Sequence, residues 1–273
     1  MSEVLVIEAG RAERHYWADL WRYRELFLLL TWRDILVRYK QTVMGIGWAL
    51  LRPLLAAAVF TVVFGKLAKL PSDGVPYPLL VAAGILPWLF FSSGLSEAGG
   101  SLLNNAGMIS KVYFPRLIIP ASAVIVSLVD LLISSVLVAA LMLWYGIAPD
   151  WRVLTLPLFV LLAFGAAVGA GLWFAALNVK YRDFRYLVPF VLQLGLYVSP
   201  VGFSSSILPD EWRLLYSLNP MAGVIDGVRW ALLGAAVPLY WPGVLLSVAL
   251  TAALLLTGIG YFRRTEKHFA DVI

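Results

Sequence analysis

The sequence contains no cysteine among its 273 residues, which excludes disulfides, thiolate metal sites and cysteine nucleophiles. Histidine is almost as scarce: the two present, His15 and His268, lie near opposite ends and outside the apolar segments. We therefore expect no metal site and no cofactor bound by this chain. The phosphate-binding pattern GxxxxGK[ST] is absent as well. Any nucleotide hydrolysis that drives this protein must come from another polypeptide, which would hold the ATP and Mg²⁺.

Charge is also sparse, at 14% of residues against about a quarter in soluble domains, while 61% of residues are hydrophobic. A soluble fold of this length has too little interior for so much apolar surface, so a bilayer must act as solvent for much of it. Residues 1–14 carry five charges and lack the apolar core of a cleavable signal. We expect an all-α integral membrane protein whose first spanning helix is retained.

Six segments are apolar over roughly the length that a bilayer requires, about 20 residues. They are 43–65, 77–97, 117–145, 153–178, 186–203 and 242–262. Segment 204–241 is half polar and broken by prolines, and within it 224–237 is expected to form a short helix that enters the membrane without crossing. The predicted organisation is a cytoplasmic N-terminal region (1–42), a six-span domain (43–262) and a cytoplasmic tail (263–273).

Basic residues set the expected orientation. With six spans and both termini inside, the cytoplasmic pieces hold 15 of the 21 Lys and Arg residues and the outer pieces hold five, with Arg52 inside the first span. This asymmetry follows the positive-inside rule. Both termini are therefore expected in the cytoplasm.

The stretch 15–41 precedes the first span and is predicted to be an amphipathic helix in the headgroup layer. Wound as a helix, it places Trp17, Leu20, Trp21, Phe27 and Leu28 on one side and Asp19, Arg22, Glu25 and Arg33 on the other. Arg24 falls among the apolar residues, from where it can reach lipid phosphate. Two interpretations stay open: a lipid anchor, or a helix that also meets a cytoplasmic partner or steers a phosphate-bearing lipid.

Three charged residues lie inside predicted spans, where charge is costly and indicates function by default. Glu97 is expected at a cytoplasmic end, where it costs little. Asp130 lies near the middle of a long span, so it should face protein or water, in a structural pair or on a transport path. Arg52 lies half-way along its span, and either Asp130 or a second copy of the chain is its expected partner.

Small residues cluster in the fourth span, with Gly165 and Gly169 at the spacing that lets two helices approach closely. Packing within one subunit is the favoured interpretation. The surplus aromatic residues within spans are either lipid-facing or line a conduit. The candidates for a conduit lining, taken with the charged residues, are Trp48, Arg52, Trp88, Phe90, Phe91, Asp130 and Tyr197.

Five stretches together resemble the membrane subunit of ABC exporters for lipid-linked polysaccharides, the ABC-2 type permeases that serve O-antigen, capsule and teichoic acid. They are WRDILVRYKQTVMGIGWALLRP (32–53), GILPWLFFSSGLSEAGGSLLNNAGMISKVYFPRLIIP (84–120), ALNVKYRDFRYLVPFVLQLGLYVSPVGF (176–203), LNPMAGVIDGVRWALLG (218–234) and FRRTEKHFADVI (262–273). They cover most of the chain in the order that the family shows.

The resemblance implies a homodimer of six-span subunits in a bacterial inner membrane, around a conduit for a lipid-linked polysaccharide, with two copies of a separate ATPase docked beneath. It implies an ATPase-facing surface made of the N-terminal helix (Trp17, Trp21, Arg22, Arg24, Glu25) and the loop after the second span. The loop residues are Ser101, Leu102, Leu103, Asn104, Asn105, Met108, Ile109, Ser110 and Lys111. It also implies short re-entrant helices before the last span. Arg33, Arg38 and Lys40 are the candidates for the lipid phosphate, and no nucleic acid is expected. Arg52 departs from the family, where glutamine or another polar residue is expected.

Three alternatives remain. Export of a drug or other lipid-like cargo by the same class of permease is the nearest. An ion-coupled secondary transporter would need charge pairs at mid-membrane and inverted repeats, and no repeat is evident in the sequence. A membrane-embedded glycosyltransferase would need acids or histidines clustered at one face, whereas Asp183, Asp210, Glu211 and Asp226 are expected on different sides.

Overall fold

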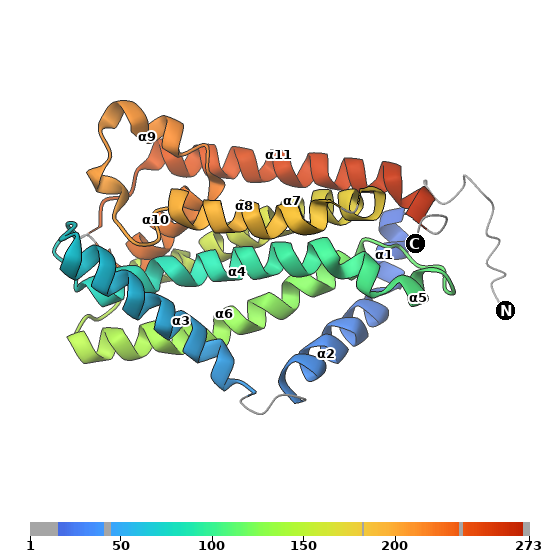
Figure 1. The fold of residues 1–273 in the computed structure, drawn as a ribbon, viewed down its shortest axis with the longest axis horizontal. Helices are drawn as coiled ribbons and strands as arrows, with labels where there is room; N and C mark the ends of the chain where they lie inside the picture. The colour runs from blue at the N-terminus through green and yellow to red at the C-terminus, as the bar shows by residue number, and fades with distance from the viewer. Residues whose placement is uncertain (1–15, 41–44, 182, 235–236, 270–273) are drawn as a thin grey trace.

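The computed structural model describes residues 16–40, 45–181, 183–234 and 237–269, and the regular secondary structure in these ranges is helical. Five segments are long and apolar enough to cross a membrane. They are α3 (Gly47–Phe60) continued by the π-helix η2 (Thr61–Leu67), α4 (Tyr77–Asn104), α6 (Ile118–Tyr145), α7 (Leu156–Lys180) preceded by the 3₁₀ helix η3 (Trp151–Thr155), and α11 (Trp241–Thr265). Four of them, α4, α6, α7 and α11, run along the long axis of the molecule (Figure 1).

The fifth expected span, 186–203, is shorter than predicted. Helix α8 (Phe184–Val198) has 15 residues, which is about 22 Å at the usual rise and less than the ~30 Å hydrocarbon core of a bilayer. The helix ends because Ser199 adopts an extended conformation, with φ −85° and ψ 151°. Pro200 follows directly, and a proline disfavours the helical conformation of the residue before it. The described residues therefore hold five helices long enough to span a membrane and one short apolar helix.

Between α8 and α11 the described residues form the short helices η4 (Ser205–Ile207), α9 (Asp210–Tyr216) and α10 (Pro220–Leu233). The short helix expected at 224–237 corresponds to α10, which begins earlier. Asn219 accepts a hydrogen bond from the backbone N–H of Met221, and Pro220 fits the first helical turn, so the two residues define the start. These helices lie together at one end of the molecule (Figure 1).

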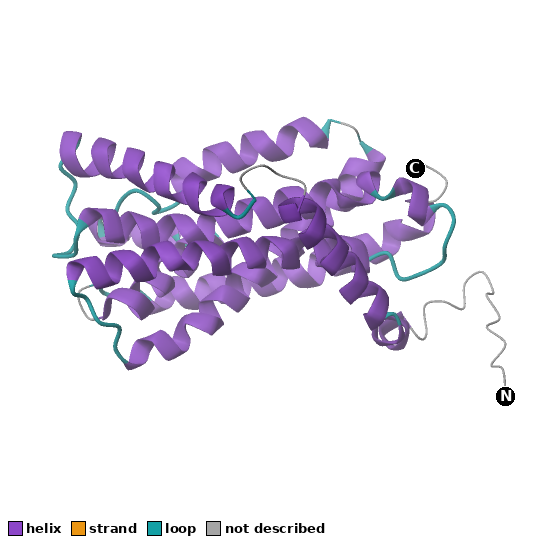
Figure 2. Ribbon diagram, turned by 90° about the horizontal axis from the view of Figure 1, so that it is seen from below, coloured by secondary structure: helices purple, strands orange, loops and turns teal. Residues whose placement is uncertain are grey.

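The opposite end holds α1 (Tyr16–Arg22), the short helix α5 (Ala106–Ile109) and the 3₁₀ helix η6 (Glu266–His268), and α2 (Arg24–Lys40) runs from there towards the middle of the molecule (Figures 1 and 2). The phenol of Tyr16 donates a 3.0 Å hydrogen bond to Glu266, so the first and last described helices meet. His15, the first two residues of the expected span 43–65 and residues 270–273 of the expected tail lie outside the described residues.

Helices α7 and α11 pack at backbone contact through their glycines. A Cβ on Gly169 would lie 2.7 Å from the backbone of Leu254 and Leu255, and one on Gly258 would lie 2.4 Å from the Gly169 carbonyl oxygen. A Cβ on Gly165 would lie 3.0 Å from the Thr251 side chain. The prediction that these small residues pack within one subunit is confirmed.

Candidate functional site

Helices α1 and α2 do not have the single apolar side that the sequence predicts. Leu20 and Phe27 pack against the core with Tyr16 and the buried Leu30, whereas Trp17 and Trp21 are 59% and 71% exposed. Leu28 and Trp32 are exposed as well. The two helices therefore have two apolar faces. One face packs against the rest of the protein, and the other is exposed on the surface. Exposed tryptophans beside membrane spans are typical of the bilayer interface.

Arg24 lies over the ring of Trp21, with 5.3 Å from its guanidinium carbon to the ring centroid. This cation–π contact orients the arginine along the exposed tryptophan face. Arg22 and Glu25, the other charged residues predicted for this surface, are also exposed. The predicted interface residues Trp17, Trp21, Arg22, Arg24 and Glu25 therefore all lie on accessible parts of the two helices.

The loop after α4 and the helix α2, predicted separately as partner-facing, touch each other. Arg33 on α2 donates to the side-chain oxygen of Asn105 at 3.0 Å, and the Asn105 amide donates to the Ser101 carbonyl at 2.9 Å. Arg33 also pairs with its neighbour Asp34 at 2.7 Å. Asn105 thus connects the end of α4 to α2.

The nine loop candidates divide by burial. Ser101, Leu102 and Ile109 are buried, and Leu102 and Ile109 belong to the core cluster that also holds Tyr16 and Leu30. Asn105 and Met108 are half-buried. Leu103, Asn104, Ser110 and Lys111 are exposed. The exposed four are accessible to a partner, and the buried three hold the loop against the helices.

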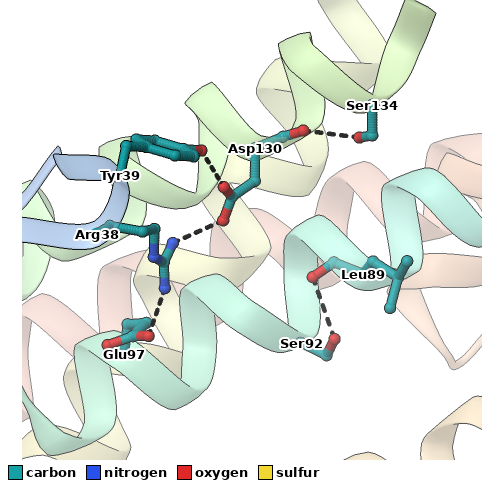
Figure 3. Close-up of polar contacts among 7 residues, drawn as sticks. All are labelled: Arg38, Tyr39, Leu89, Ser92, Glu97, Asp130 and Ser134. Atoms are coloured by element: carbon teal, nitrogen blue, oxygen red, sulfur yellow. Dashed lines mark hydrogen bonds and ion pairs between the residues drawn. The ribbon is translucent and has the colours of Figure 1, made fainter. Parts of the chain in front are cut away.

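Arg38 and Asp130 are at the centre of a polar network between α2, α4 and α6 (Figure 3). The Arg38 guanidinium lies 2.6 Å from a carboxylate oxygen of Asp130 on α6 and 2.6 Å from one of Glu97 on α4. Tyr39, the next residue on α2, donates to the other Asp130 oxygen. Burial, together with this hydrogen bond, raises the pKa of Tyr39. The network ties α2 to two membrane helices through charge-assisted bonds.

This network settles one of the alternatives left by the sequence. Asp130, one of the two partners expected for Arg52, pairs with Arg38 instead. Glu97 is exposed, and it also pairs with Arg38. Of the three residues predicted to attract lipid phosphate, Arg38 has two carboxylate partners and Arg33 has one, while Lys40 is exposed at the end of α2.

Next to the network is a cavity of about 230 Å³ between α2, α3, α4 and α6. Its walls include four of the seven conduit candidates, Trp48, Arg52, Phe90 and Asp130, and also Arg38 and Tyr39. In the part of the chain that the structure describes, Arg52 is exposed and forms no ion pair, so it adds an uncompensated positive charge to this cavity. The cavity therefore contains polar groups from the middle of α3 and α6, two otherwise apolar helices.

The other three conduit candidates lie elsewhere. Trp88 is buried against α8, where a Cβ on Gly195 would lie 2.6 Å from its ring. Phe91 packs beside Trp88, with ring centroids 5.6 Å apart. Tyr197 is 62% exposed near the end of α8.

A second polar centre, at the end of the molecule with α9 and α10, was missed by the sequence analysis. Arg229 on α10 is fully buried and donates to three backbone carbonyls, those of Leu80 at 3.0 Å, Val201 at 2.8 Å and Phe203 at 2.8 Å. One turn earlier, Asp226 accepts a 2.6 Å hydrogen bond from Ser205. The available signal was the pair Asp226 and Arg229, three residues apart in an otherwise apolar helix. Arg229 therefore holds α10 to α4 and to the segment after α8.

Long apolar helices, short broken helices at one end and a charged cavity between spans are the features of a membrane transport subunit. The sequence matches the ABC-2 type transporter family over residues 25–233, and the chain belongs to this family. The family expected from the sequence is thereby confirmed.

Curated relatives align with this chain over nearly their whole length. It is 28% identical over 258 residues to the O-antigen export system permease protein RfbA of Myxococcus xanthus, covering 93% of this chain and 98% of that protein. It is 26% identical over 257 residues to an O-antigen export system permease protein RfbA of Klebsiella pneumoniae, covering 91% and 95%. It is 23% identical over 242 residues to the polysialic acid transport protein KpsM of Escherichia coli, covering 86% and 91%.

Proposed function

We propose that this chain is the membrane passage of an ABC exporter that moves a lipid-linked polysaccharide out of a bacterial cytoplasm, driven by a separate ATPase. The observation that carries the proposal is the near full-length similarity to permeases named for O-antigen and polysialic acid transport. The absence of a phosphate-binding GxxxxGK[ST] loop supports an external source of energy. The chain then binds no ATP or Mg²⁺ itself.

The topology that we propose has six crossings and both termini in the cytoplasm. Five long helices alone would leave the two ends of the chain on opposite sides of the membrane. The hydrogen bond between Tyr16 and Glu266 supports ends on the same side, which requires an even number of crossings. The short helix α8, with the extended segment after it, is the remaining crossing. The excess of basic residues in the pieces then assigned to the inside supports a cytoplasmic location for the ends.

We propose that the ATPase acts on the exposed residues of the loop after α4 and on helices α1 and α2. The Arg33–Asn105 hydrogen bond supports joint movement of these two surfaces. From α2, the Arg38 pairs with Glu97 and Asp130 would carry the displacement into α4 and α6. Two ATPase copies under a homodimer of this chain is the assembly that we propose, with the conduit between the subunits.

Export of a surface polymer tests this function in cells depleted of the chain. We expect the polymer to disappear from the cell surface while its lipid-linked form accumulates inside, and to return when the chain is supplied together with its ATPase. An unchanged surface polymer would overturn the cargo assignment. Accumulation of a drug or other lipid-like compound in the depleted cells would favour the alternative cargo for the same class of permease.

A further inference from the structure

A cavity of about 650 Å³ lies away from the network around Arg38, at the end of the molecule where Tyr16 meets Glu266. It is formed by the end of α11 with η6, the segment that precedes α6, and Tyr16 of α1. Four of its lining residues are basic, Arg116, Arg263, Arg264 and Lys267, and one is acidic, Glu266. The lining therefore carries a positive net charge when all five groups are ionised.

Glu266, Arg116 and Arg263 are held in place by contacts with one another or with Tyr16. Glu266 accepts the hydrogen bond from the Tyr16 phenol, and Arg116 donates to the backbone carbonyl of Glu266. Arg263 lies over the ring of Tyr16, 4.6 Å from its centroid. Arg264 is exposed, and among the described residues its side chain forms no ion pair or hydrogen bond. Tyr16 and Glu266 are thus held in place within the lining, and the Arg264 side chain is accessible to an anion.

Part of the cavity lining is apolar and belongs to a segment long enough to span a membrane. Leu256, Ile259 and Gly260 line it from the last turns of α11, and Leu256 is 73% exposed. The basic residues Arg263, Arg264 and Lys267 follow at the end of the same span. One cavity therefore presents hydrocarbon-contacting residues on the membrane side and cations on the side of the headgroups. An acidic protein segment would match the cations but not the apolar wall.

We propose that this cavity binds the phosphate of an anionic membrane phospholipid, with an acyl chain along α11 and Arg264 as the principal ligand of the phosphate. Basic pockets between membrane helices on the cytoplasmic side are a known means of holding acidic lipid headgroups. The site is separate from the cavity next to Arg38 and does not depend on which cargo the permease carries. A bound lipid would join α1, the start of α6 and the end of α11.

Two acids oppose the phosphate. Glu266 lines the cavity, and Asp19 of α1 lies close enough to act on Tyr113 of the lining. Burial raises the pKa of Glu266 to about 6, against the lowering effect of the Tyr16 hydrogen bond and of the nearby cations Arg116, Arg263 and Lys267. Glu266 is therefore ionised above that pH and repels an anionic headgroup more strongly there. Replacing Glu266 by glutamine keeps an acceptor for Tyr16 and removes this repulsion.

Native mass spectrometry of the purified full chain, titrated with phosphatidylglycerol and in parallel with phosphatidylcholine, tests the site. We expect one phosphatidylglycerol to be retained in preference to phosphatidylcholine at pH 7.5. Arg264→Gln should weaken that retention about fivefold, the effect of one basic residue near an anionic surface. Glu266→Gln should strengthen it. The matched control is Arg185→Gln, which removes an exposed arginine of α8 outside the cavity and should leave retention unchanged.

Three results would overturn the proposal. Equal loss in the Arg264→Gln and Arg185→Gln variants would mean that lipid follows the overall charge of the surface. Displacement of the lipid by millimolar inorganic phosphate would indicate a site for a free anion. Unchanged lipid retention by Arg264→Gln would show that Arg264 does not bind the phosphate, and loss of the ATPase from a parallel preparation of that variant with its ATPase would assign the basic surface to that protein.

Discussion

The guanidinium of Arg38 lies 2.6 Å from a carboxylate oxygen of Asp130, and this pair joins the helix before the first span to the middle of α6. Both side chains are about a quarter exposed, at 26% and 28%. Charge pairs shielded from water are stronger than those on a solvated surface, because less solvent screens them. The position of α2 is therefore set by electrostatics as well as by the apolar contacts of Leu30.

Replacing Asp130 by asparagine tests this pair. Asp130→Asn removes one of the two carboxylates paired with Arg38 and leaves Glu97 as the other. We expect the free energy of unfolding to fall by up to about 1.5–3 kcal/mol, the usual size of a hydrogen bond to a charged group. Thermal unfolding in detergent gives the change. Ser135→Ala, on an exposed turn of the same helix, is the control and should be neutral. In a double-mutant cycle with Arg38→Gln, a coupling energy of zero would contradict the account.

Substitution of Asn105 separates transport from folding. Asn105→Lys places a cation beside Arg33 and removes its acceptor, so export should be lost while membrane insertion persists. Asn105→Asp keeps an acceptor for Arg33 and should retain most export. The measurement is surface polymer per unit of inserted protein in cells that express the ATPase. Full export by the lysine variant would disprove the coupling role of this loop.

Arg52 is expected to act on cargo rather than on stability. Because Arg52 forms no ion pair among the described residues, Arg52→Gln should change the free energy of unfolding by less than about 0.5 kcal/mol. Export of an acidic glycan or of its lipid pyrophosphate should fall more than export of a neutral glycan. Comparing both cargoes in reconstituted complexes measures the difference. A loss of stability as large as that of Asp130→Asn would show that Arg52 has a structural partner.

Glu266 makes stability depend on pH. Its pKa is raised from 4.5 to about 6 in the folded protein, so the folded state holds this proton more tightly than the unfolded chain does. The associated stabilisation is complete below about pH 4.5 and is lost as pH rises through about 6, by up to about 2 kcal/mol.

Thermal unfolding between pH 4.5 and 7.5 measures this effect. Glu266→Gln should flatten the profile over that interval, whereas the control Glu211→Gln, at an exposed position on α9, should not. A profile that keeps its slope in the Glu266→Gln variant would assign the pH dependence to another group.

Hydrophobic length and proline position made most of the fold predictable. The long apolar runs predicted four spans to within a few residues, because a bilayer demands a continuous helix there. The length of α8 was overestimated because the apolar sequence continues past Ser199, whereas the helical conformation of the backbone ends there. Helix breaks depend on local geometry, which composition does not reveal.

The partners of the charged and polar residues were much less predictable from the sequence than the positions of the helices. The sequence indicated that Asp130 needs a partner, but the choice of Arg38 over Arg52 depends on how α2 folds back against α4 and α6. The same holds for Asn105 and Arg33, which are 72 residues apart. Arg229 was missed because its three carbonyl acceptors lie on distant segments. Such contacts follow from tertiary packing and leave no periodic pattern.

Translocation by the purified chain in sealed vesicles, with and without its ATPase, is the most direct test of the central claim. The chain is reconstituted with lipid-linked glycan on the outer leaflet of inside-out vesicles, and glycan that reaches the lumen is measured by its protection from an added glycosidase. We predict protection only when both the ATPase and ATP are present. Vectorial uptake by this chain alone, with or without an ion gradient, would contradict the claim that it forms a passage moved by another protein.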